Sequence, residues 1–342
     1  MSKIQELLFG KNDIINYDEI IEQQPWIVRR NMNCILSPDS DGLLSGLIMS
    51  HFLNWKIVGF YDGKVMALQK GINPTDDNCA FLDMEIFRKN VRSCGHHMLL
   101  LNKRQKSELW EERYQNCIQP NLLRNYDGKN DFRLKYPLAT IHLLIGNLSR
   151  KFSIELPRTA ISSLFFTDGV FQILYSYPEN VLNWLNYLGI NDLKSPLRQI
   201  FMHDHFTVYS QIVEMDKFFR LRDAISIKGE RGDRLRISTS EGTPFNLESQ
   251  GNSLYSLNLD SKDRVLRFIS ILAQSTGWHY KEENWNFDNL LVSQFTKFDF
   301  KSRGWRLNGK TFKEFLELDP LSWAMTSGDN IEFTLEQPAV FY

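Results

Sequence analysis

The chain has 342 residues, a length that suits two domains more comfortably than one. Its hydrophobic fraction of 42% and charged fraction of 24% are ordinary for a globular protein and argue against extensive disorder and a fibrous architecture. The formal net charge of −1 excludes a global basic field for nucleic acid but leaves a local basic groove open.

Targeting features are missing from the printed sequence. No apolar run approaches the roughly 20 residues that span a bilayer. The N-terminal segment alternates charged and apolar residues at helical spacing and lacks the uninterrupted apolar core of a secretion signal. None of the cysteines forms a CxxC pair, and most sit in or beside apolar runs: Cys34, Cys79, Cys94 and Cys117. These features predict a cytoplasmic protein with no membrane partner.

The first half alternates short predicted strands with helices. The expected strands cover 33–37, 56–61 and 79–83, with a fourth inside 91–101. The expected helices cover 42–55, 138–149 and 158–166. Strands interleaved with helices imply right-handed crossovers. The predicted fold class is therefore α/β, with a mostly parallel sheet flanked by helices.

The pattern changes after about residue 178. A helix is expected over 180–188, a β-hairpin over 225–240, and short strands near 295–300 and 331–335. A boundary at roughly 190–215 divides the chain into a first domain, 1–195, and a smaller α+β domain, 210–342. The second domain is expected to bind the substrate or a partner.

Acidic and imidazole side chains fall where the predicted strands end. Asp39 and Asp41 follow the first strand, Asp83 ends the third, and His96 and His97 lie in or just after the fourth. Ligands of open α/β sheets bind outside the carboxyl ends of the strands. Carboxylates with imidazole suit Mn²⁺ or Mg²⁺ better than a thiolate-seeking metal. A divalent ion there can polarise a phosphoryl oxygen and activate water.

Each of these features also has an ordinary structural explanation. Asp-Ser-Asp-Gly suits a turn, and an aspartate at the end of a strand often caps the next helix. Adjacent histidines in an apolar stretch can be hydrogen-bonded core residues. The ordered combination is less expected by accident.

That combination resembles the motifs of the DHH phosphoesterases over roughly residues 30–175. LSPDSDGLLSG is similar to the first motif, CAFLDMEI to the second, SCGHHML to the Asp-His-His motif and FFTDGVF, which contains Asp168, to the fourth. The resemblance implies that one metal is held by Asp41, Asp83, His96 and Asp168. It implies a second metal on Asp39 and Asp83, and a substrate-phosphate contact by His97.

Two positions depart from the family pattern. Ser37 stands where the family has an upstream His or Asp ligand for the second metal. Gly95 stands where the family has the aspartate of Asp-His-His, so an orienting carboxylate is missing. Such supporting groups typically change affinity or activity by about 10–100-fold. The first metal site is complete by this comparison, and the two-metal mechanism is open.

A PP-loop is a competing interpretation of residues 37–42. PP-loops bind pyrophosphate with backbone N–H groups at a helix N-terminus. This loop lacks paired glycines, and a PP-loop would leave His96, His97 and Asp168 unexplained.

The segment around Lys228 to Arg236 is the nearest candidate for a basic phosphate contact. Its ordinary explanation is a solvated hairpin tip. Its functional interpretation places Arg231 and Arg234 over substrate phosphates.

The sequence therefore predicts a Mn²⁺- or Mg²⁺-dependent phosphoesterase. The expected substrate is a nucleotide, a short oligonucleotide or single-stranded nucleic acid, with Asp39 and His97 acting in catalysis. The alternative is a non-catalytic relative that binds a nucleotide or nucleic acid as a sensor or subunit. A homodimer or larger complex is compatible with either.

Overall fold

The computed structural model describes residues 3–204, 207–227, 231–298, 305–306, 312–325, 330–336 and 340–341. Within them, nine strands form one sheet in the order β6-β5-β4-β1-β2-β3-β9-β8-β7. Their bounds are β1 (Asn33–Leu36), β2 (Lys56–Tyr61), β3 (Val65–Gln69), β4 (Cys79–Leu82), β5 (Arg92–Cys94), β6 (Cys117–Ile118), β7 (Leu247–Gly251), β8 (Leu254–Leu257) and β9 (Leu290–Gln294).

The sheet has a parallel half and an antiparallel half. Strands β6, β5, β4, β1 and β2 run parallel, whereas β3, β9, β8 and β7 pair antiparallel. Strand β1 leads to β2 on one side, while β4 lies on its other side and leads to β5 and β6. The chain therefore reverses its direction of travel across the sheet between β1 and β4, where open α/β sheets bind ligands. The α/β fold class is confirmed.

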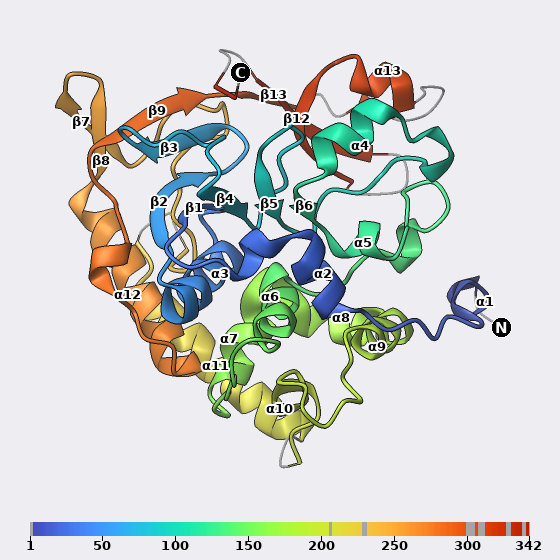
Figure 1. Cartoon of the computed structure of the whole chain (residues 1–342). Helices are drawn as coiled ribbons and strands as arrows, with labels where there is room; N and C mark the ends of the chain where they lie inside the picture. The colour runs from blue at the N-terminus through green and yellow to red at the C-terminus, as the bar shows by residue number, and fades with distance from the viewer. Residues whose placement is uncertain are drawn as a thin grey trace.

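Helices cover one face of this sheet (Figure 1). The helices of the described residues are α1 (Lys3–Leu8), α2 (Tyr17–Gln23), α3 (Ser40–Leu53), α4 (Glu108–Tyr114), α5 (Pro120–Leu123), α6 (Thr140–Leu148), α7 (Ala160–Phe166), α8 (Val170–Ser176), α9 (Pro178–Tyr187), α10 (Arg198–Phe201), α11 (Val208–Ala224), α12 (Leu259–Thr276) and α13 (Phe312–Leu316). None of them is long and apolar enough to cross a membrane.

Side-chain alternation along β1 explains why both faces of the sheet are buried. Cys34 and Leu36 belong to the core on the helical face, whereas Ile35 belongs to a second core that includes Leu321 and Phe341. Successive strand residues point to opposite faces. A strand buried on both sides must therefore be an uninterrupted apolar run, as this one is.

Helix α3 connects β1 to β2 and is buried almost all round, with α6 and α12 packed against it. A Cβ at Gly42 would lie 1.9 Å from the Ser37 carbonyl oxygen, so only glycine permits this close approach of the first turn to the end of β1. The tight turn fixes the direction in which the loop before α3 faces.

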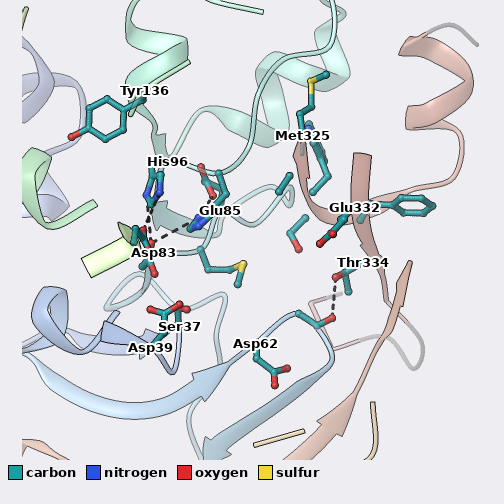
Figure 2. Close-up of a pocket in the computed structure, with 18 of the residues that line it drawn as sticks. Ser37, Asp39, Asp62, Asp83, Glu85, His96, Tyr136, Met325, Glu332 and Thr334 are labelled. Atoms are coloured by element: carbon teal, nitrogen blue, oxygen red, sulfur yellow. Dashed lines mark hydrogen bonds and ion pairs between the residues drawn. The ribbon is translucent and has the colours of Figure 1, made fainter. Parts of the chain in front are cut away.

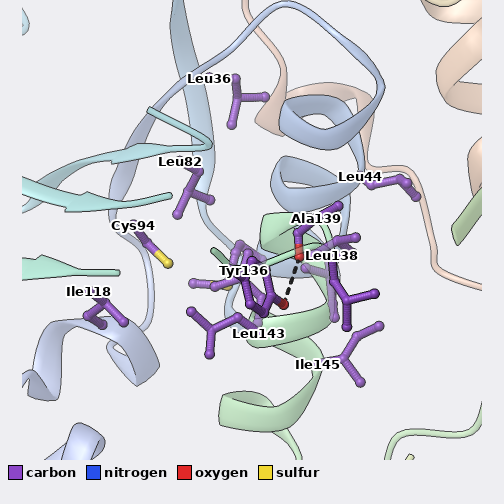
Figure 3. Close-up of a cluster of buried hydrophobic side chains, with 14 of the residues drawn as sticks. Leu36, Leu44, Leu82, Cys94, Ile118, Tyr136, Leu138, Ala139, Leu143 and Ile145 are labelled. Atoms are coloured by element: carbon purple, nitrogen blue, oxygen red, sulfur yellow. Dashed lines mark hydrogen bonds between the residues drawn. The ribbon is translucent and has the colours of Figure 1, made fainter. Parts of the chain in front are cut away.

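The segment before α6 fills the space under the carboxyl ends of the strands (Figure 3). Tyr136, Leu138 and Ala139 are buried there beside Leu82 and Cys94, and the Tyr136 hydroxyl donates to the Ala139 carbonyl at 3.2 Å. This packing holds the N-terminus of α6 against the edge of the sheet that carries the site.

A second, smaller sheet lies on the side of the main sheet opposite the helices α3, α6 and α12 (Figure 1). It contains β10 (Thr296–Phe298), β11 (Trp305–Arg306), β12 (Pro320–Met325) and β13 (Asn330–Leu335), with β13 paired antiparallel to the other three. The predicted second domain, 210–342, supplies this sheet but also supplies β7, β8 and β9 to the main sheet. The main sheet is thus continuous across the predicted boundary, and the boundary itself stays a prediction.

The hairpin predicted over 225–240 is wrong for the part of it that the structure describes, and positions 228–230 lie outside the described residues. No strand is formed over 231–240. Instead, the Leu235 N–H donates to the Pro38 carbonyl at 2.9 Å, and the Phe245 N–H donates to the Ile237 carbonyl. One backbone N–H of this segment therefore bonds to the loop before α3 and not to a partner strand.

Candidate metal centre

Four potential ligands meet beyond the carboxyl ends of the parallel strands. Asp83 follows β4, His96 and His97 follow β5, and Asp168 lies in the short 3-10 turn between α7 and α8. One ligand atom from each of these residues lies within 4.8 Å of the others. Figure 2 shows Asp83 and His96 side by side at this edge. The arrangement can bind a metal ion.

The two aspartates of the cluster adopt backbone conformations that are uncommon for residues other than glycine. The φ angles are 59° at Asp83 and 51° at Asp168. Asp and Asn enter this left-handed region more easily than other residues, but still at a cost of order 1–3 kcal/mol. Both residues end a regular element abruptly, and their side chains converge on His96.

Thr140, the first residue of α6, fixes the protonation of His96. Its hydroxyl donates to Asp83 Oδ1 at 2.9 Å and lies 2.8 Å from His96 Nδ1. A hydroxyl has one proton, so with that proton on Asp83 it can only accept from an Nδ1–H of His96. With Asp83 ionised, as it is when it binds a metal ion, this contact therefore favours the His96 tautomer with the proton on Nδ1 and the lone pair on Nε2.

That lone pair faces a carboxylate. His96 Nε2 lies 3.1 Å from Asp168 Oδ2, and the two atoms repel unless a cation or a proton lies between them. When two ligand atoms bind one octahedral ion at right angles with bonds of about 2.1 Å, they lie about 3 Å from each other. The distance between His96 Nε2 and Asp168 Oδ2 matches this value. Asp83 Oδ2, buried and without a hydrogen-bond partner among the described residues, supplies a third donor atom. The donor set therefore fits a divalent ion.

Burial shifts the pKa of every group in the cluster toward its neutral form. The pKa of Asp83 is raised well above its ordinary value by burial and then by its neighbours Asp41, Asp39 and Asp168. Burial also raises the pKa of Asp168, which His97 and Arg234 lower in part. A proton or a metal cation shared between the carboxylates relieves such crowding.

Burial favours the neutral form of both imidazoles. Burial lowers the pKa of His96 to about 3 and that of His97 to about 3, since a charged ring is poorly solvated there. Neutral imidazole is the form that binds metal ions.

Asp41 lies beside the cluster and caps a helix. Its two oxygens accept from the Thr140 N–H at 2.7 Å and the Ile141 N–H at 3.0 Å, the first amides of α6. It lies 3.7 Å from His96 Nδ1, the protonated side of that ring. Its immediate role is to hold α6, and so the Thr140 hydroxyl, in place.

Asp39 and Ser37 lie at the start of α3. Asp39 is the N-cap, and its Oδ1 accepts from the Gly42 N–H at 3.2 Å. Ser37 is 7% exposed and lines the same cavity. Neither residue belongs to the four-residue cluster of the described chain.

Glu85 brings a further carboxylate to the histidines. It is 1% exposed, its Oε1 accepts from the Met98 N–H at 3.0 Å, and its Oε2 lies 4.0 Å from His97 Nδ1. A Cβ at Gly95 would lie 2.7 Å from Glu85 Oε2, so the carboxylate occupies the space over this glycine. Burial raises the pKa of Glu85 to about 7.

The cluster opens into a large cleft of about 1310 Å³. Figure 2 shows Asp83 and Glu85 on one side of it and Glu332 and Thr334, on β13, on the other. The cationic side chains that line the cleft are Lys64, Arg133, Lys135, Arg234, Arg236 and Lys297. Asp62 and Glu332 also line the cleft, and Lys297 Nζ lies 3.7 Å from Glu332 Oε2. The positive charges that act on the cluster itself are those of Lys135 and Arg234.

The two arginines predicted to contact substrate differ in position. Arg234 lines the cleft and is placed there by the hydrogen bond between Leu235 and Pro38. Arg231 is absent from the residues that line the cleft, and its Nε and Nη2 pair with both oxygens of Asp233, at 3.0 and 2.8 Å.

Three residues of the site escaped sequence reasoning about its chemistry. Thr140 is the first residue of a helix, and that position gives no sign of a hydroxyl shared by two ligands. Glu85 follows Asp83 by two residues, and Lys135 precedes the helix that carries Thr140. Burial lowers the pKa of Lys135, while Glu85 and Asp168 raise it.

Comparison of the chain with family models, with curated proteins and with solved structures gave no match.

Proposed function

We propose that the protein is a metal-dependent phosphoesterase that hydrolyses a phosphodiester bond in a nucleotide, a short oligonucleotide or single-stranded nucleic acid. One observation carries the proposal: the cluster of Asp83, His96, His97 and Asp168 opens into a cleft lined by lysines and arginines. A metal centre surrounded by fixed cations suits a phosphate ester, whose charge must be neutralised before a nucleophile can approach.

In this proposal, Asp83, His96 and Asp168 hold a Mn²⁺ or Mg²⁺ ion through oxygen and imidazole donors. When bound, the ion polarises a phosphoryl oxygen and favours ionisation of a water molecule. Thr140 keeps the Nε2 lone pair of His96 directed at the ion by accepting from Nδ1. Asp83, His96 and Asp168 are three of the four ligands that the resemblance to DHH phosphoesterases implies for the first metal. In this proposal the fourth, Asp41, supports the site instead of binding the ion.

Substrate charge is balanced by side chains of the cleft. Lys135 and Arg234 both interact electrostatically with Asp168, so they lie near the position where a phosphate would reach the ion. The lowered pKa of His97 means that this ring adds no positive charge to the balance. Arg231 is engaged with Asp233, so we assign phosphate recognition to Arg234.

The second candidate function is a non-catalytic binding module, and the positions of Asp39 and Asp41 favour it. Both carboxylates accept backbone N–H groups at helix N-termini, which leaves three or four ligands for one ion. Ser37, with a hydroxyl in place of a carboxylate or imidazole, adds a poor ligand for a second ion.

The PP-loop alternative is weaker for a related reason. The Gly42 N–H at the start of α3 donates to the Asp39 carboxylate. An amide that such a loop would offer to pyrophosphate is therefore already used by an anion, and that anion repels phosphate.

A hydrolysis screen with Mn²⁺ tests the proposal. Linear and cyclic dinucleotides, short RNA and DNA, and pyrophosphate are incubated with the wild type, Asp83→Ala and His96→Ala, with Asp216→Asn on the exposed face of α11 as a matched carboxylate control. We expect Mn²⁺-dependent turnover in the wild type and the control, and its loss in the two site variants. No turnover of any substrate, with nucleotide binding retained, would leave only the binding-module function. Turnover that survives both substitutions would rule out this site.

A further inference from the structure

The ring of His97 has a buried edge and an exposed one. Its Nδ1 is buried and has no hydrogen-bond partner among the described residues, although 35% of the side chain is exposed. The exposed part therefore lies on the rest of the ring, whose Nε2 is on the edge away from Nδ1. Because His97 lines the cleft, that edge is the one a ligand can reach.

Two carboxylates face the buried edge. Nδ1 lies 3.8 Å from Asp83 Oδ1 and 4.0 Å from Glu85 Oε2. Asp83 Oδ1 already accepts from the Thr140 hydroxyl. Glu85 Oε1 accepts from the Met98 N–H, and backbone N–H groups of Glu85 and His97 also stabilise the charged form of this carboxyl group. Oε2 is the oxygen of Glu85 that faces His97 Nδ1. A separation of 4.0 Å is longer than a hydrogen bond, but such contacts commonly tighten when a site is filled.

Glu85 occupies its place because position 95 has no side chain. A Cβ there would lie 2.7 Å from Oε2 and 2.8 Å from the carboxyl carbon of Glu85. Glycine at 95 and glutamate at 85 are therefore a matched pair, in which one leaves a space and the other fills it with a carboxylate. The Glu85 carboxyl group is 1% exposed, and its backbone hydrogen bonds do not fully offset the cost of desolvation.

We propose that Glu85 is a positioning residue that holds His97 with its proton on Nδ1 and presents the Nε2 lone pair to the cleft. His97 then acts as a hydrogen-bond or proton acceptor toward whatever the cleft binds, not as a donor to phosphate. The inference concerns the orientation of His97, and its meaning for catalysis rests on the proposed function.

Glutamine at position 85 gives the sharpest test. Its carbonyl replaces Oε1 toward Met98, and its NH₂ group faces His97 Nδ1, where it favours a lone pair. Glu85→Gln should therefore move the His97 proton from Nδ1 to Nε2. The readout is the ¹⁵N chemical shift of the ring nitrogens in metal-free protein labelled at histidine, at pH 8, assigned by comparison with His97→Gln.

Moving the carboxylate tests the same idea by rescue. Glu85→Ala should populate both tautomers, and Glu85→Ala combined with Gly95→Asp should restore the Nδ1–H form, because the double variant returns a carboxylate to the vacated space. Gly95→Asp alone should be strongly destabilised by the contact with Glu85. The double variant should recover the thermal midpoint that Gly95→Asp loses.

The inference predicts that the His97 proton moves from Nδ1 to Nε2 in Glu85→Gln. It also predicts that the Nδ1–H form is restored in the double variant Glu85→Ala with Gly95→Asp. An Nδ1–H tautomer that is unchanged in Glu85→Gln, or an Nε2–H tautomer in the wild type, would overturn the inference. Neither measurement requires turnover, so loss of the proposed function would leave this result standing, and failure here would leave Mn²⁺-dependent turnover untouched.

Discussion

The Thr140 hydroxyl lies 2.8 Å from Nδ1 of His96, and this contact decides which nitrogen of the ring can bind a metal ion. The same hydroxyl donates to Asp83 Oδ1, so one side chain at the start of α6 orients two ligands from two different strands. Asp41 fixes that helix N-terminus from α3. The ligands and their supports thus form one connected network.

Removing the Thr140 hydroxyl should weaken metal binding without disturbing the helix. Thr140→Val keeps the shape of the side chain but leaves His96 Nδ1 and Asp83 Oδ1 without their shared partner. We expect Mn²⁺ affinity to fall by about 10–100-fold, as for other groups that support metal ligands. Isothermal titration calorimetry measures this, and Thr140→Ser should retain most of the affinity. Equal affinities for the valine variant and the wild type would contradict the assignment.

Asp41 and Asp83 should respond differently to the same substitution. Asp41→Asn places an NH₂ group against one of two backbone N–H donors and should cost about 1–3 kcal/mol in the free energy of unfolding. The pKa of Asp83 is raised by burial and then by the nearby Asp41, so its charged form is unfavourable in the metal-free fold. Asp83→Asn removes that charge, and the metal-free variant should therefore be at least as stable as the wild type. Urea denaturation in EDTA compares them. A reversed order of stabilities would show that Asp41 is the metal ligand and Asp83 the support.

Glu85 should give the protein a distinctive pH dependence of stability. Burial raises the pKa of Glu85 from its ordinary value of 4.5 to about 7 in the folded protein. A carboxyl group with a raised folded pKa stabilises the fold fully below pH 4.5 and loses that contribution as the pH rises through 7. Glu85→Gln cannot ionise, so between pH 5 and pH 8 it should gain up to about 3 kcal/mol relative to the wild type. A difference that does not change with pH would contradict the buried-carboxylate assignment.

Metal binding should weaken in mild acid because of carboxylates rather than imidazoles. Burial and then neighbouring carboxylates hold the pKa of Asp83 well above its ordinary value, whereas burial lowers the pKa of His96 to about 3. Protons therefore compete with the ion at Asp83 first, and Mn²⁺ affinity should rise with pH with proton release on binding. Titrations in two buffers of different ionisation enthalpy count the protons. Asp83→Asn should release fewer of them, and an unchanged count in that variant would refute the assignment.

The parallel half of the fold follows from the sequence because its strands are short, apolar and separated by helical segments. Asp83 and His96 could be placed at one sheet edge for the same reason, since the carboxyl ends of parallel strands meet at one edge. Asp168 follows helix α7, and only the resemblance to the DHH motifs predicted that it joins them. The antiparallel half could not be predicted, because β3 and β9 pair although more than 200 residues separate them in the sequence. No local pattern encodes such a pairing.

Polar residues with two possible uses are a second case in which the sequence leaves the role open. Asp39 and Asp41 have the same spacing that a metal pair would have, yet both accept hydrogen bonds from helix N-termini. Sequence spacing cannot distinguish a cap from a ligand, because both need a carboxylate just after a strand. Glu85 was invisible for the opposite reason: its role depends on the absence of a side chain at Gly95, which only packing reveals.

The most direct test of the central claim is anomalous diffraction from a crystal soaked in Mn²⁺, recorded on both sides of the manganese absorption edge. We expect a peak within bonding distance of Asp83 Oδ2, His96 Nε2 and Asp168 Oδ2, and its loss in Asp83→Asn. No peak at this edge of the sheet, or a peak bound instead by Asp39 with none at His96, would contradict the account.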